Sequence, residues 1–118
     1  MADIRKQIKK GLLEIAVLDL LLEDDSYGYV IIQKLKEYSD GIFDLKEGTL
    51  YPILYRLEDS KYIESYWKTM NELRSKPRKY YKITNEGRKV FSEILEDYNF
   101  ITGGLNSILN RRKEGKGV

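Results

Sequence analysis

Residues 46–87 read KEGTLYPILYRLEDSKYIESYWKTMNELRSKPRKYYKITNEG, and this stretch decides the fold. Its first third has apolar residues at intervals of three and four, which is the pattern of a helix with one buried face. The predicted core-facing stripe is Leu50, Ile53, Leu54 and Leu57. Asp44 and Glu47 together resemble a capping box. Pro52, however, lacks an N–H and is tolerated only in a first helical turn, so we expect the helix to begin near Glu47 or Gly48.

The opposite side of this predicted helix carries aromatic and polar side chains. They are Gly48, Thr49, Tyr51, Pro52, Tyr55 and Arg56, with Lys46 directly before the helix. A helix that lies in the major groove of DNA explains this set, because Tyr and Thr can contact phosphates and Arg can reach guanine. A protein interface or an ordinary solvated surface explains it as well.

A basic hairpin follows the helix. Residues 62–69 and 78–84 alternate and are rich in aromatic and β-branched side chains, which predicts two strands. The positions expected to face inward are Ile63, Trp67, Tyr81 and Ile83. Positive charge gathers where the strands join, at Arg74, Lys76, Arg78 and Lys79. A phosphate backbone is the anion that best neutralises such a cluster, and a solvated loop is the alternative.

Two further helices are predicted before this stretch. Residues 4–22 are apolar on nearly every side in their second half, so one neighbour cannot cover them. Ser26 is expected to cap a second helix over residues 27–39. The expected core face of that helix is Val30, Ile31, Leu35 and Tyr38. Tyr27 and Tyr29 in its first turn are candidate phosphate contacts, because helix N-termini and phenolic hydroxyls commonly bind phosphates.

A C-terminal helix is predicted over residues 85–113, with Thr84 as its N-cap, and residues 114–118 are expected to form a disordered tail. Apolar side chains recur along this helix at intervals of three and four, which is the pattern of a seam that pairs with another helix. The seam is Phe91, Ile94, Tyr98, Ile101, Leu105 and Ile108. We therefore expect residues 1–84 to form a DNA-binding domain and residues 85–113 to form a helix that pairs two copies of the chain into a homodimer.

Composition narrows the possible functions. The net charge is only +2, but residues 1–10 carry four Lys/Arg against one acid, residues 11–60 four against eleven, and residues 61–89 nine against three. Without Cys or His, the chain lacks thiolates, the usual general base and the commonest metal ligand. We therefore expect no enzyme, cofactor or metal site. No long apolar run or signal-like N-terminus is present, so a cytoplasmic protein without a membrane partner is expected.

Three motifs carry a family resemblance. SYGYVIIQKL at 26–35, EGTLYPILYRLEDSKYI at 47–63 and KPRKYYKITNEG at 76–87 together resemble the PadR-like family of bacterial transcriptional regulators, in its short subgroup with one C-terminal helix. The resemblance implies a mainly α protein with a small β-hairpin (α+β class): a winged helix-turn-helix plus a C-terminal dimerisation helix. Relatives often have a Gly before the Ile where this chain has Ser60, Lys61 and Tyr62, which leaves the geometry of that turn open.

The resemblance also implies a function. It predicts a homodimeric repressor that binds a near-palindromic operator in double-stranded DNA and is released by a small aromatic effector. The tentative effector site is Tyr98 and Trp67; packing of Tyr98 against its symmetry mate is the alternative. Two rival classes are a winged-helix module for protein interaction and a small-molecule binding protein with incidental DNA affinity. Binding to random DNA that weakens steeply with salt would indicate a regulator and not a protein-interaction module. Dye binding that leaves the DNA affinity unchanged would indicate a small-molecule binding protein.

Overall fold

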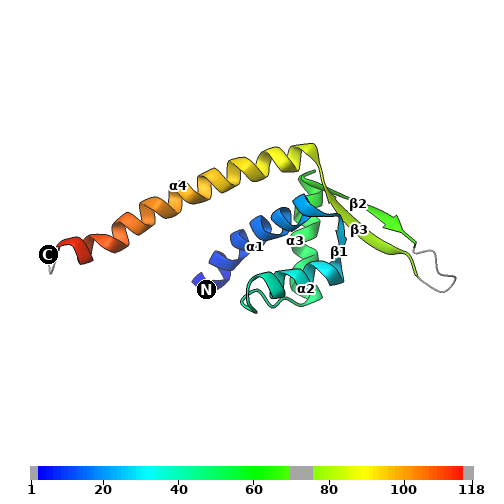
Figure 1. Ribbon diagram of the computed structural model, residues 1–118, viewed down its shortest axis with the longest axis horizontal. Coiled ribbons are helices and arrows are strands. Elements are labelled where there is room, and N and C mark those ends of the chain that lie inside the picture. Colours follow the sequence, from blue (N-terminus) through cyan, green and yellow to red (C-terminus); the bar gives the residue numbers. More distant parts are fainter. Residues whose placement is uncertain (1–2, 70–75, 116–118) are drawn as a thin grey trace.

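The computed structural model describes residues 3–69 and 76–115, which form helices around a small sheet (Figure 1). The helices are α1 (Ile4–Glu23), α2 (Gly28–Tyr38), α3 (Glu47–Asp59) and α4 (Asn85–Gly115), and the strands are β1 (Ser26–Tyr27), β2 (Ile63–Lys68) and β3 (Arg78–Ile83). This order is that of a winged helix-turn-helix with an added C-terminal helix, which confirms the predicted α+β class. We call the β2–β3 hairpin the wing.

The core lies between α1, α2, α3 and the inner face of the sheet. The four residues of the predicted α3 stripe are at most 4% exposed, and α3 begins at Glu47, as predicted. Pro52 is then the sixth residue of the helix, so the premise that it must lie in the first turn is wrong. On α2, Ile31 and Leu35 are buried and Val30 is half-buried, but Tyr38 is 60% exposed. The prediction for Tyr38 is therefore wrong. Phe43, from the segment after α2, packs against the core at that end and leaves Tyr38 at the rim.

The sheet is antiparallel with the order β1-β3-β2. Its edge strand explains why Ser26 does not cap α2 as predicted. Ser26 pairs with Tyr81 and Tyr27 with Tyr80, so the backbone at this point extends the sheet. The N-cap of α2 is Tyr27, which makes no side-chain capping hydrogen bond. A pairing with a strand far along the chain thus overrides the local capping preference of a serine.

The wing confirms both predicted strands and three of the four inward positions. Ile63, Tyr81 and Ile83 are at most 4% exposed, whereas Trp67 is 68% exposed. Trp67 shares the face of Ile63, but it pairs with Lys79 near the outer end of the hairpin, where the helices no longer cover the sheet (Figure 1). Alternation correctly gives the face of the strand, but the core does not reach this far.

The turn after α3 has a left-handed residue that is not glycine. Lys61 has a φ of 66°, its N–H donates to the carbonyl of Glu58 at 2.9 Å, and the N–H of Tyr62 donates to the carbonyl of Leu57 at 3.0 Å. These two bonds define a Schellman motif, which usually places glycine at the left-handed position. The turn is therefore formed here with a lysine at the position that usually takes glycine.

Helix α4 begins as predicted and then leaves the body of the molecule (Figure 1). The hydroxyl of Thr84 accepts a hydrogen bond from the N–H of Gly87 at 2.9 Å, which confirms Thr84 as the N-cap. A Cβ on Gly87 would lie 2.0 Å from the carbonyl oxygen of Tyr62, so only glycine permits this close start. The helix continues to Gly115, two residues past the predicted end. The rest of the predicted tail, residues 116–118, lies outside the described residues.

The far part of α4 and the start of α1 present apolar side chains to solvent. Phe91 packs against the core and Ile94 is half-buried beside α1, but Ile101, Leu105 and Ile108 are between 51% and 67% exposed. On α1, Ile4 and Ile8 are 72% and 59% exposed. The molecule is elongated and measures 70 × 28 × 28 Å. The exposed apolar side chains of α4 and α1 lie outside its core. None of the helices in the described ranges combines the length and apolar composition that a membrane crossing requires.

Candidate nucleic-acid interface

The surface of α3 that faces away from the core has the composition that the sequence predicted. All six residues of the predicted outer side are exposed: Gly48, Thr49, Tyr51, Pro52, Tyr55 and Arg56. Tyr55 is 77% exposed and Tyr51 is 42% exposed, and Lys46 occupies the N-cap position in front of the helix. The helix therefore presents large aromatic groups to solvent between the wing on one side and α1 on the other.

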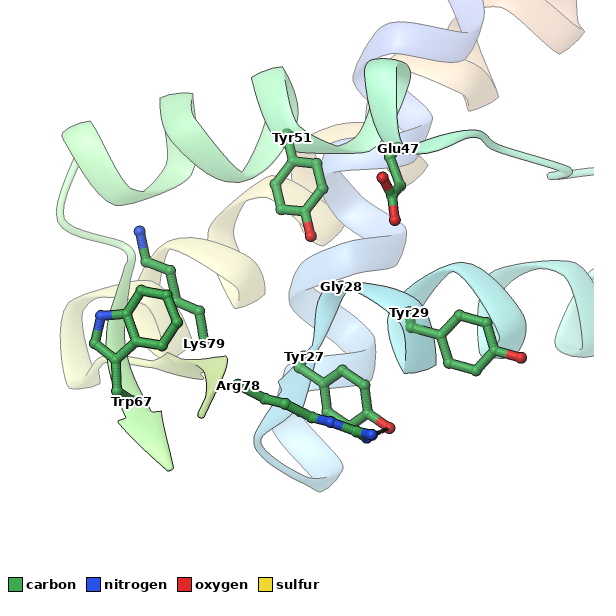
Figure 2. A pocket seen from close by; sticks show the side chains of 8 residues that line it. All are labelled: Tyr27, Gly28, Tyr29, Glu47, Tyr51, Trp67, Arg78 and Lys79. Atoms are coloured by element: carbon green, nitrogen blue, oxygen red, sulfur yellow. Dashed lines mark hydrogen bonds between the residues drawn. The ribbon is translucent and has the colours of Figure 1, made fainter. Parts of the chain in front are cut away.

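A hollow of about 440 Å³ lies between α3, the start of α2 and the wing (Figure 2). Its lining brings together five predicted DNA contacts with three other residues: Tyr27, Tyr29, Tyr51, Arg78 and Lys79, then Gly28, Glu47 and Trp67. The hydroxyl of Tyr29 accepts a hydrogen bond from Gln33 at 2.9 Å and the side chain is 59% exposed. The hollow is thus open, aromatic and cationic, with Glu47 as the carboxylate in its lining.

Tyr27 holds Arg78 in a defined orientation on the floor of this hollow. The guanidinium carbon of Arg78 lies 4.6 Å from the centre of the Tyr27 ring, and Arg78 also donates a hydrogen bond to the Tyr27 hydroxyl (Figure 2). A cation over an aromatic face is attracted by the ring quadrupole. Tyr27 was predicted as a phosphate contact, and its hydroxyl accepts this bond, so its own O–H can still be donated to a phosphate. Tyr27 also orients Arg78 in the site.

Gly28 is a site residue that the sequence analysis missed. A Cβ at this position would lie 2.6 Å from the hydroxyl oxygen of Tyr51. The glycine therefore allows the Tyr51 side chain to point from α3 to the first turn of α2, as Figure 2 shows. The signal available in the sequence was the SYGY motif itself, where glycine opens a helix that most residues would favour more strongly.

A row of three tyrosines stiffens the outer face of the sheet. The ring of Tyr80 lies 5.3 Å from that of Tyr27 and 5.7 Å from that of Tyr66, measured between centroids. The Tyr66 hydroxyl donates to the carboxylate of Asp25 at 2.6 Å, and this hydrogen bond, with burial and the negative charge, raises the pKa of Tyr66 to about 12. Strand alternation places Tyr66 and Tyr80 on one face, so the pair could have been predicted from the sequence. The link to Asp25 could not.

Arg56 lies on the exposed side of α3 but is already engaged. Its Nε and Nη2 donate to one carboxylate oxygen of Glu14 on α1, at 3.1 and 2.9 Å. The two side chains remain 42% and 34% exposed, so this ion pair is open to solvent. A base contact from Arg56 would require the pair to open.

The remaining predicted residues fall in different parts of the molecule. Lys76 is exposed just before β3, and Arg74 lies outside the described residues. Trp67 lines the hollow beside α3, whereas Tyr98 is half-buried on α4, which runs away from the sheet (Figure 1). Within one chain the structure therefore does not bring together the two residues of the tentative effector site.

Comparison with known proteins agrees with this geometry. A model of the family described as "Transcriptional regulator PadR-like family" matches residues 17–93. A protein of Lysinibacillus sphaericus, described only as uncharacterized protein X, is 37% identical over 95 residues, which cover 80% of this chain and 85% of that protein.

Solved structures agree as well. A transcriptional regulator from Clostridium thermocellum is 36% identical, with a TM-score of 0.77 over 86% of this chain and 96% of that one. A PadR family transcriptional regulator from Eggerthella lenta is 30% identical, with a TM-score of 0.78 over 90% of this chain and 88% of that one. The family model spans more than half of the chain, and these similarities extend across most of it. The chain therefore belongs to the PadR-like family of transcriptional regulators.

Proposed function

We propose that this regulator is a sequence-specific DNA-binding protein that acts as a homodimeric repressor at a near-palindromic operator. The observation that carries the proposal is the hollow that Tyr51 of α3 shares with Arg78 and Lys79 of the wing. A recognition helix beside a cationic hairpin can enter a major groove while the hairpin holds the adjacent backbone.

The chemistry of the two surfaces suggests how the work is divided. On α3, Tyr55 and Tyr51 project from a helix whose opposite side is fully packed, so they are held at fixed positions along a groove. On the wing, Arg78 is stacked on Tyr27 and is ready to contact a phosphate without losing much side-chain freedom. We propose that α3 reads bases and that the wing, with Lys76, Lys79 and Arg74, binds backbone. Gly48, Thr49, Pro52 and Lys46 would approach the same groove.

Two copies of the chain are proposed to pair through α4 and α1. The exposed residues of the seam and Ile4 and Ile8 of α1 form an apolar surface for which the single chain has no cover. Soluble monomers rarely expose contiguous apolar patches of more than a few hundred Å². Pairing would bury this surface and would hold two copies of α3 at a fixed separation, which is what a two-fold operator requires.

A small aromatic effector is proposed to bind between the subunits at Tyr98. Tyr98 is half-buried and lies in the seam between Ile94, which contacts α1, and Ile101, which is exposed. A flat ligand at this level would separate or reorient the paired helices. Trp67 would join such a site only by contact with the partner subunit, because its own chain keeps it beside α3. Packing of Tyr98 against its symmetry mate is the competing arrangement.

Selection of duplexes from a random DNA pool tests the DNA-binding proposal. We expect the parent protein to enrich a near-palindrome. The double variant Arg78→Gln with Lys79→Gln should bind selected and random duplexes more weakly alike. Its plot of log affinity against log salt should be less steep by about 3.6 if each side chain neutralises one phosphate in each of the two subunits. Arg88→Gln with Lys89→Gln removes the same charge from the start of α4 and should behave as the parent.

Failure would take one of two forms. If no sequence is enriched and binding to random DNA is weak at low salt, the chain is a protein-interaction module. If the salt slope of the wing variant equals that of the parent, the wing does not bind the backbone. To test repression, the selected operator is placed before a reporter gene: expression should fall with the parent protein and recover with the wing variant.

A further inference from the structure

The face of α1 that is directed toward α3 is apolar in the middle of the helix and basic near its N-terminus. Leu13 and Val17 on this face are 3% and 0% exposed and pack in the core. One and two turns earlier the same stripe continues, but its residues are no longer apolar. They are Lys6, Lys9 and Lys10, all exposed. The N-terminal part of α1 thus extends past the core and carries three ammonium groups over the side of α3.

These lysines share a second hollow with α3. It has a volume of about 400 Å³ and is lined by the three lysines together with Asp44, Thr49, Pro52 and Arg56 and a few apolar core residues. Two residues along a helix turn a side chain by about 200°, so Thr49 lies on the side of α3 opposite Tyr51. Tyr51 faces the hollow with Arg78 and Lys79. The exposed ridge of α3 therefore has a cationic hollow on each side.

The charge of the second hollow remains available to a ligand. Arg56 is bound by Glu14, and Asp44 lies 4.0 Å from Lys36 of α2. Among the side chains of residues 3–69 and 76–112, no carboxylate lies within 4.0 Å of any of the three lysines. Lys6 is also two residues from both Ile4 and Ile8, so it points away from the apolar side that the proposed dimer would bury. Pairing of subunits would leave the lysines exposed.

We propose that Lys6, Lys9 and Lys10 form a second phosphate-binding surface, which holds the DNA strand on the far side of the groove from the wing. This inference rests on the proposed function. The major groove is bounded by one sugar-phosphate backbone on each side, and a helix that lies in it has a strand at either flank. The wing supplies cations at one flank of α3 and α1 supplies them at the other. The duplex is then clamped across the recognition helix.

Double-stranded DNA is the ligand favoured over an acidic protein. The lysines stand beside Thr49 and Pro52, which belong to the same outer surface of α3 as Tyr55. Any partner seated there while the protein is on its operator would have to share this space with the duplex. Lysines on flexible stems also suit a row of phosphates, which need charge more than fixed geometry.

The test uses the full chain and two triple variants of equal charge. One replaces Lys6, Lys9 and Lys10 with Gln, and the control replaces Arg88, Lys89 and Arg111 with Gln on α4, away from α3. Affinity for a selected operator and for a random duplex is measured over a range of salt. The slope of log affinity against log salt should fall by about 0.9 for each phosphate that is no longer neutralised. For a dimer of the α1 triple variant it should fall by up to about 5.4, equally on both duplexes. The control variant should keep the parental slope.

The strand assignment is tested with duplexes whose phosphates are made neutral, as methylphosphonates, on one side of the groove at a time. Neutral phosphates on the strand opposite the wing should weaken the parent but not the α1 triple variant. Neutral phosphates on the strand at the wing should weaken both the parent and the α1 triple variant, and should have a smaller effect on the double variant Arg78→Gln with Lys79→Gln. Circular dichroism shows whether each variant keeps the parental fold. Single Lys9→Gln gives a milder second variant, in which the slope for the dimer should fall by about 1.8.

The outcomes distinguish this inference from the function on which it rests. If the parent shows no salt-dependent DNA binding, the proposed function fails. If the parent binds DNA with a steep salt slope and the α1 triple variant is unchanged, only the second phosphate surface is overturned. The inference is equally overturned if the DNA affinities of the α1 triple variant and of the wing variant are lowered by neutral phosphates on the same strand. It is also overturned if the α1 triple variant loses only the binding of an acidic protein and keeps parental DNA affinity.

Discussion

Ile101→Glu is the sharpest test of the proposed dimer. Ile101 lies on the part of α4 that stands clear of the body, and it is 67% exposed in the single chain (Figure 1). A glutamate there should have little effect on a monomer, because about two thirds of the side chain is exposed in the single chain. Asn110→Glu is the matched control: Asn110 is exposed on the same helix, and nine residues place it about 180° around from Ile101.

The size of the effect follows from the exposed fraction. Full burial of an Ile side chain stabilises by about 1.5–3 kcal/mol, so the exposed two thirds of Ile101 can still gain about 1–2 kcal/mol on pairing. A two-fold dimer contains the residue twice, and the substitution therefore removes about 2–4 kcal/mol before any cost of desolvating the carboxylates. Because about 1.4 kcal/mol corresponds to a factor of ten, the dissociation constant of the dimer should rise about 30- to 1,000-fold.

Sedimentation velocity over a dilution series measures this shift directly. The parent and Asn110→Glu should sediment as dimers at concentrations where Ile101→Glu is largely monomeric. The melting temperature of the parent should rise with protein concentration, because association stabilises the folded chain. The reasoning is refuted if Ile101→Glu sediments with the parent at every dilution, or if the two glutamate variants dissociate equally.

Three further substitutions test local features of the structure. Lys61→Gly should stabilise the fold by about 0.5–1 kcal/mol in urea denaturation, since glycine relieves the left-handed strain at some entropic cost; a lower midpoint would contradict this. Asp25 raises the pKa of Tyr66 to about 12, above its usual value near 10, so the contribution of Tyr66 is complete below pH 10 and lost as pH rises through about 12. The stability gap between the parent and Tyr66→Phe should therefore close between those values, and a constant gap would exclude the Asp25 hydrogen bond. Gly28→Ala should displace Tyr51 and cost about 1–3 kcal/mol of discrimination between operator and random DNA, with an unchanged salt slope.

The parts of the fold that the sequence predicted well are those governed by local pattern. The buried stripe of α3 follows from spacing alone, and the helix begins at the predicted Glu47 even though Pro52 lies past its first turn. Ser26 was misassigned because its backbone pairs with a strand that begins about fifty residues later. Trp67 was misassigned because alternation gives the side of a strand but not how far the core extends beneath it. Both errors concern partners that a single segment does not contain.

The same distinction applies to the candidate site. Exposure of Tyr51 and Tyr55 could be predicted, since it is the complement of the buried stripe. The ion pair between Arg56 and Glu14, 42 residues apart, could not be predicted. The hydrogen bond from Arg78 to the Tyr27 hydroxyl, 51 residues apart, could not be predicted either. The basic N-terminal segment was visible as a count of charges, but its position beside α3 depends on how α1 packs.

Helix α1 is continuous over 20 residues, so a small rotation of the helix produces a large displacement at its N-terminal end. Its C-terminal half is anchored in the core at Leu21, while Lys6 lies fifteen residues away, about 22 Å along the axis. A rotation of α1 by about 10° about Leu21, which would also shift the core contact of Leu13 by about 2 Å, would therefore swing Lys6 through about 4 Å. That displacement is more than the reach over which an ammonium group keeps contact with one phosphate. The same helix carries the apolar side that faces the proposed partner, so a change in subunit packing would be magnified at its tip. Release of the operator would then need no rearrangement of α3 itself.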